Sequence, residues 1–126
     1  DTDWLAICVN DNSIKDQAYT DDAGDTWQEA YIILMRKNGE IAMYSRRSGA
    51  TVALLDNDTT FGGYSTGGTG DYRLTVTPTS ISFSRMSGGV AQETITTSDT
   101  AHRGGYFHFG RSSMAGAFSN VTVTRN

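Results

Sequence analysis

One stretch near the end of the chain decides the fold: residues 104–124, GGYFHFGRSSMAGAFSNVTVT. Its pattern predicts two strands separated by a loop of small residues. In the first strand Tyr106 and His108 alternate with two Phe residues, so the Phe side chains share one face and the other two side chains share the opposite face. The apolar pattern resumes after the loop with one irregular step near Ser119, which indicates a bulge. The residues of this stretch that we expect in the core are Phe107, Phe109, Phe118, Val121 and Val123.

The size and composition of the chain favour a single all-β domain. Its 126 residues suffice for one core that buries roughly two thirds of the surface of the unfolded chain. Fourteen Gly, one Pro and no sustained helical periodicity are typical of many strands joined by turns. We therefore predict that residues 1–126 form one antiparallel β-sandwich of two sheets.

Charge and hydropathy exclude two classes of partner. The net charge is −4 and the basic residues are scattered, so the chain lacks the basic patch that nucleic-acid binding requires. The longest apolar run, 30–35, is too short to cross a bilayer, and no membrane insertion is expected. Because residue 1 is not Met, the chain is either a mature product or a module of a larger protein; we favour the module.

Two strand signals upstream of the closing stretch are strong. The run 4–9 is apolar at every position, as expected of a central strand. Runs 27–36 and 40–46 flank Lys37-Asn38-Gly39, where Asn-Gly predicts a type I′ hairpin with both residues at positive φ. The second of these runs should bury the face formed by Ile41, Met43 and Ser45.

The remaining segments comprise strands and two loops. Residues 71–77 alternate, which predicts Tyr72, Leu74 and Val76 inside, and Ile81 and Phe83 continue that face. Residues 90–97 form a polar strand that suits a sheet edge. Residues 10–24 and 56–70 are loop-like, and long loops in compact domains are often functional.

The order of these elements resembles the concanavalin A-like lectin/glucanase superfamily, in particular its laminin G-like branches. The similarity covers residues 27–124 and rests on the Asn-Gly hairpin, on Gly-Gly-strand-Gly at residues 104–110, and on Phe118-Ser119-Asn120-Val121-Thr122-Val123. The resemblance implies a jelly roll with ligands on the concave face or at the loop rim. It leaves sugar-binding modules, glycosidases, lyases and adhesion domains open.

Catalysis has little support in the sequence. Retaining glycosidases need two carboxylates about 5–5.5 Å apart, and the acidic signature of the glucanases has no counterpart here. Tyr106, His108 and Arg111 could supply part of a lyase site, but the Arg-rich and Gln-x-His strands of such enzymes are absent. The site residues therefore include no catalytic group.

Metal binding is a further hypothesis. Loop carboxylates offer hard oxygen ligands that suit Ca²⁺, and the resemblance to a superfamily whose members often carry a rim Ca²⁺ supports it. Solvated loop acids are the plainer interpretation, and no other cofactor is expected. The candidate metal ligands are Asp21, Asp22, Asp25, Asp56 and Asp58.

Sugar binding is the function that best fits a set of aromatic side chains that have Arg and His residues near them in the sequence. Pyranose faces stack on aromatic rings, and Arg and His hydrogen-bond to hydroxyls. We expect a non-catalytic carbohydrate-binding or adhesion module that binds a glycan or glycoprotein outside the cell, on the cell surface or on a virion. Two alternatives stay open: a structural domain of an extracellular or viral appendage that contacts other subunits, and a partial hydrolase or lyase. The candidate ligand-binding residues are Tyr44, Arg46, Tyr64, Tyr106, His108 and Arg111.

Overall fold

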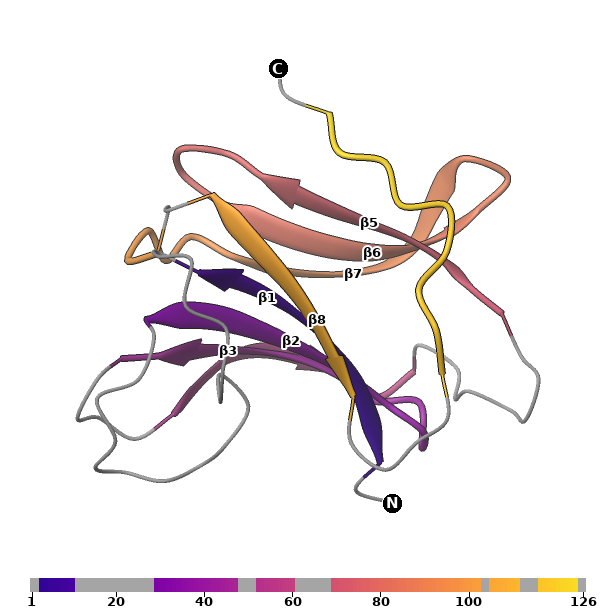
Figure 1. Cartoon of the computed structure of the whole chain (residues 1–126), viewed down its shortest axis with the longest axis horizontal. Helices are drawn as coiled ribbons and strands as arrows, with labels where there is room; N and C mark the ends of the chain where they lie inside the picture. Colours follow the sequence, from indigo (N-terminus) through magenta and orange to yellow (C-terminus); the bar gives the residue numbers. More distant parts are fainter. Residues whose placement is uncertain are drawn as a thin grey trace.

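The computed structural model describes residues 3–10, 29–47, 52–60, 69–102, 105–111 and 116–124. These residues form eight strands in two antiparallel sheets and contain no helix. The sheets face each other as two layers, so the expectation of an all-β, sandwich-like domain is confirmed (Figure 1). The strands are β1 Trp4–Asn10, β2 Ala30–Arg36, β3 Ile41–Arg46, β4 Ala53–Asp58, β5 Asp71–Val76, β6 Ile81–Ser87, β7 Val90–Thr97 and β8 Tyr106–Arg111.

The strand order follows the sequence except at β8. The larger sheet has the order β4-β3-β2-β1-β8 and the smaller β5-β6-β7, so β8 returns over a long connection to lie beside β1. Strands β1 to β4 are consecutive neighbours, and the chain passes through the whole smaller sheet before it reaches β8. β1 is therefore central, as predicted, with β2 on one edge and β8 on the other. Its two apolar faces belong to different clusters, since Leu5 and Val9 lie in the main core and Cys8 packs with Ile32 on the opposite face.

The main core lies between the sheets. Strand alternation places every second residue of β1, β2 and β3 against β6 and β7. The expected inward residues of β3 and β6 are confirmed, since Ile41, Met43, Ile81 and Phe83 are buried. Tyr72 and Leu74 pack against this core as predicted, whereas Val76 at the end of β5 is exposed.

The β2–β3 hairpin forms as predicted, with a different turn. Gly39 N donates to Arg36 O at 3.0 Å, and Arg36 N donates to Glu40 O at 2.8 Å. Gly39 has φ 98°, but Asn38 does not have positive φ, so the prediction of a type I′ turn is wrong for Asn38. The Asn38 side chain accepts a hydrogen bond from Glu40 N at 3.0 Å, which stabilises a three-residue loop with glycine last.

One side of the sandwich is closed. β4 and β7, which are edge strands of different sheets, lie against each other there. Asp56 Oδ2 accepts a hydrogen bond from Thr96 N at 2.9 Å and so links the two layers directly. Within the smaller sheet, Arg85 and Glu93 form a bidentate pair with two contacts of 2.7 Å.

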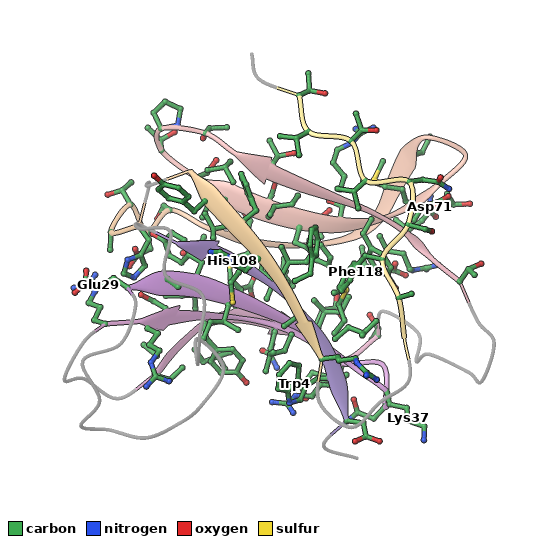
Figure 2. All side chains as sticks on the ribbon, viewed as in Figure 1. Trp4, Glu29, Lys37, Asp71, His108 and Phe118 are labelled. Carbon is green, nitrogen blue, oxygen red and sulfur yellow. The ribbon has the colours of Figure 1, made fainter. Side chains whose placement is uncertain are left out.

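The opposite side is open, and the predicted core there is largely wrong. β8 and β5 do not contact each other in the described part of the chain. Phe107 and Phe109 do point to the core face, opposite Val9 and Ile7, but they stay 40% and 46% exposed because no strand of the smaller sheet covers them. Phe118 packs against the core there, with its ring centroid 4.5 Å from that of Phe109 (Figure 2).

The segment after Phe118 forms no strand, contrary to the prediction. Asn120 has φ 52°, in the left-handed region that few residues other than glycine adopt. Beyond this residue Val121 and Val123 are 55% and 75% exposed, so neither is part of the core.

Candidate functional site

The candidate site is one end of the larger sheet, where β1 ends, β2 begins, β3 ends and β8 begins. The connections 11–29, 47–52 and 98–105 all leave the strands at this point. Glu29 marks this end in Figure 2, whereas Trp4 and Lys37 lie at the other. We call it the loop-bearing end and define it by Glu29, Tyr31, Ser45, Arg46, Arg47, Asp99, His102 and Tyr106.

A buried hydrogen-bond network lies under the loop-bearing end. The Tyr31 hydroxyl donates to Asp99 Oδ1 at 2.5 Å and accepts from the backbone N–H of His102 at 3.3 Å. The Tyr31 and His102 rings also meet edge to face, with centroids 4.8 Å apart. These contacts fasten the segment after β7 to the start of β2, in the other sheet.

The His102 side chain extends this network to β3. Its Nε2 lies 3.1 Å from Ser45 Oγ, and its Nδ1 lies 4.0 Å from Glu29 Oε2. A Ser, a His and a carboxylate in this order also occur in hydrolases. Here Ser45 is 5% exposed and His102 is fully buried, so a substrate does not reach the hydroxyl. The Ser45–His102 contact therefore satisfies buried polar groups, as interiors require.

Charged groups cover the network on the solvent side. Arg47 Nη2 lies 3.7 Å from Asp99 Oδ2, and the side chains of Arg47 and Glu29 are about half exposed. The hydrogen bond from Tyr31 is the main cause that lowers the pKa of Asp99, and the backbone N–H of Ala101 and the charge of Arg47 lower it further. Asp99 is thus an ionised carboxylate held in a fixed position.

Four of the predicted ligand residues share the outer face of the larger sheet, away from the core. β1 and β2 separate the two on β3 from the two on β8, and three strand spacings correspond to roughly 14 Å. Paired positions form two rows across the sheet: Tyr44, Ile32, Cys8 and His108, and next to it Arg46, Ala30, Asn10 and Tyr106.

These four residues differ in exposure. Tyr106 is 46% exposed at the loop-bearing end, whereas Arg46 is buried. Tyr44 is half-buried against a second apolar cluster formed by Cys8 and Ile32. His108 is also half-buried, and its Nε2 has no hydrogen-bond partner within the described part of the chain.

The other two predicted ligand residues lie elsewhere. Arg111 is the last residue of β8 and is opposite Leu5, so it shares the face of the Phe residues. Arg111 therefore lies on the opposite face from Tyr106 and His108. Tyr64 lies outside the described residues.

Only two of the five predicted metal ligands, Asp56 and Asp58, are among the described residues. Asp21, Asp22 and Asp25 lie outside the described residues. Asp56 accepts backbone hydrogen bonds on both oxygens, from Asn57 and Thr96, at 2.9 Å each. Asp58 Oδ1 accepts from the hydroxyl and the N–H of Thr60, and these bonds lower its pKa. The described residues contain no cluster of three metal-ligating side chains, and Ca²⁺ binding stays a prediction.

Sequence reasoning missed the network, although two signals were present. Ser45 occupies a core position of β3, and a buried hydroxyl needs a partner. Thr97 and Asp99 are the second signal, because their side chains stabilise the turn before His102: Thr97 Oγ1 accepts from Asp99 N, and Asp99 Oδ1 accepts from Ala101 N. Neither signal identifies Tyr31, whose hydroxyl joins the two parts.

None of the protein-family models, curated proteins or solved structures compared with the chain matches it. The function is therefore argued from the chemistry of the site alone. Among the described residues there is also no helix of the length and hydropathy that a bilayer span requires.

Proposed function

We propose that this domain is a non-catalytic carbohydrate-binding or adhesion module that holds its ligand at the loop-bearing end. One observation carries the proposal: Glu29, Arg47 and Asp99 are accessible to solvent, and the buried hydrogen bonds among Tyr31, Asp99 and His102 hold the backbone beneath them in place. Carboxylates held in place accept hydrogen bonds from ligand hydroxyls, and a guanidinium donates hydrogen bonds to them, in defined directions. Rigid placement also reduces the entropy lost when a ligand binds.

The Tyr106 ring adds a surface on which a sugar can stack. It is 46% exposed and begins β8 at the same end of the sheet. Arg47 follows β3 and Tyr106 begins β8, and these two strands are three strand spacings, or roughly 14 Å, apart. A ligand in contact with both residues would therefore be an oligosaccharide. Action outside a cell or on a virion is part of this proposal.

The fold assignment within this proposal is the concanavalin A-like jelly roll. Two facing antiparallel sheets and the return of β8 beside β1 support it. The long runs of consecutive neighbours, β1 to β4 and β5 to β7, are meanders and count against this assignment, because a jelly roll is built from two Greek keys.

The decisive experiment is a glycan array followed by titration of any bound glycan while amide shifts are recorded. We expect shifts at residues 29–31, 45–47 and 99–106. Arg47→Ala and Tyr106→Ala should each weaken binding about tenfold or more, which corresponds to about 1.4 kcal/mol. The control is Arg73→Ala, an exposed Arg on β5 of the other sheet, which should bind like the parent.

Three outcomes would contradict the proposal. Shifts confined to the Asn38-Gly39 turn would place the ligand at the wrong end of the sheet. Release of shortened products from the glycan would favour the hydrolase or lyase alternative. The absence of shifts with every glycan would favour a structural domain.

The structural alternative has an observation of its own. Phe107 and Phe109 leave half-exposed rings on the open side of the sandwich, and Val121 and Val123 are also exposed. Exposed apolar patches of this kind are typical of protein contacts.

A further inference from the structure

β8 is the least protected edge of the two sheets. Natural edge strands carry charges, proline or bulges that prevent pairing with other chains. β4 has two Asp residues and a register shift opposite β3, and it lies against β7. β5 carries Asp71 and Arg73, and β7 carries Glu93. Residues 106–110 of β8 include neither a permanently charged side chain nor a proline. β1 pairs with one of its two edges, and none of the other strands in the described ranges pairs with the second.

The side chains beside this edge are apolar and only half covered. Phe107 and Phe109 point to the core face but remain 40% and 46% exposed, since β5 does not reach them. A strand added at the free edge of β8 would place its own side chains beside both rings, would bury part of their exposed area and would satisfy the outward N–H and C=O groups of β8. This is the arrangement that peptides adopt in β-augmentation.

We propose that the added strand is β8 of a second copy of this chain, paired antiparallel about a two-fold axis at His108. The sequence of the strand is symmetric about this residue, Phe107-His108-Phe109. Phe107 then lies opposite Phe109 of the second copy, and Tyr106 lies opposite Gly110. The side-chain period of two keeps all four Phe rings on the core face.

Charge is compatible with this pairing. Arg111 is the one permanently charged residue of β8. In the antiparallel arrangement the two Arg111 residues lie at opposite ends of the paired β8 strands, so their charges do not face each other across the interface. The five-stranded sheets of the two copies become one sheet of ten strands. Self-complementary contacts of this kind close on themselves and produce a dimer, not a fibre.

The pairing has a consequence for binding, which rests on the proposed function. Antiparallel strands run in opposite directions, so the two loop-bearing ends point away from each other. One flat surface does not engage both ends at once, and the avidity expected from two adjacent sites would be absent. The dimer would instead bridge two ligand-bearing surfaces.

Sedimentation velocity on the isolated chain without glycan tests the pairing separately from the proposed function. The interface is short, so we expect weak, concentration-dependent dimers. Tyr106→Lys and Phe107→Lys place a charge on the outer and inner face of the edge, and each should weaken dimerisation at least tenfold. The control, Val90→Lys, introduces the same charge at an exposed position of β7 and should dimerise like the parent.

Hydrogen exchange read residue by residue completes the test. The free-edge amides of β8 should exchange more slowly as protein concentration rises. A parent chain that stays monomeric at millimolar concentration would overturn the proposal, as would equal dimerisation of Tyr106→Lys and Val90→Lys. Slow exchange at every concentration would show that the chain covers its own edge, and this outcome also contradicts the dimer. If Phe107→Lys fails to fold, Tyr106→Lys decides.

Discussion

Tyr31→Phe tests the network beneath the candidate site by removal of one oxygen. The hydroxyl donates to the Asp99 carboxylate at 2.5 Å and accepts from His102 N at 3.3 Å. A hydrogen bond to a charged group contributes about 1.5–3 kcal/mol, and a buried N–H left without a partner costs about 1–3 kcal/mol. Water can replace part of the bond to Asp99, whose side chain is 24% exposed. We therefore expect the free energy of unfolding to fall by about 2–3 kcal/mol.

Urea unfolding at pH 7 and pH 3 provides the measurement. The folded-state pKa of Asp99 is lowered, so its stabilising contribution is present above pH about 4 and is lost as pH falls through the folded-state value. The difference between parent and Tyr31→Phe should therefore shrink at pH 3. Tyr44→Phe removes a hydroxyl from the outer face and should change stability by less than about 0.5 kcal/mol.

The double variant Tyr31→Phe/Asp99→Ala separates the contribution of the Tyr31–Asp99 hydrogen bond from the other effects of removing the Tyr31 hydroxyl. If Tyr31 and Asp99 act through their hydrogen bond, the sum of the losses in unfolding free energy of the two single variants should exceed the loss of the double variant. The expected difference is about 1 kcal/mol or more. Tyr31→Phe with parental stability at pH 7 would refute the argument that the network supports the site.

Three further predictions concern the frame around the site. Gly39→Val places a branched side chain at φ 98° and should cost about 1–3 kcal/mol in urea unfolding without a change in ligand affinity; parental stability would refute the turn geometry. Phe109→Ala should cost about 1.5–2.5 kcal/mol because the ring is half exposed, against about 3–5 kcal/mol for the buried Phe83→Ala; equal losses would mean that β8 is covered. Stability of the parent should fall below pH about 4, and Asp99→Asn should flatten this dependence in thermal melts at several pH values.

Local patterns in the sequence predicted most of the strands and the faces of several of them, but not the absence of a strand after Phe118. Asn-Gly located the β2–β3 hairpin, and alternation identified Ile41 and Met43 as core residues. Both signals act over a few residues, where sequence and geometry are directly linked. The turn type was missed because the Asn38 side chain bonds to Glu40 N and favours a longer loop with a single positive φ.

The remaining features depend on contacts between distant residues. Periodicity identified the correct face of Phe107 and Phe109, but the length and position of the opposite sheet decide whether that face is covered. The same holds for the candidate site. Tyr31 meets Asp99 and His102 across 68 and 71 positions of the chain, and no local pattern contains such a pairing.

The position of β8 beside β1 also determines the order in which the domain can fold. The hairpins β2–β3, β5–β6 and β6–β7 join strands that are close in sequence, whereas β1 and β8 are separated by nearly the whole chain. Closure of long loops is slow, so β8 should dock last. Until it does, β1 presents an apolar strand with a vacant edge, and aggregation during refolding should begin there. Pulsed hydrogen exchange during refolding should show the β1–β8 amides protected after those of β2–β3; simultaneous protection would contradict this order.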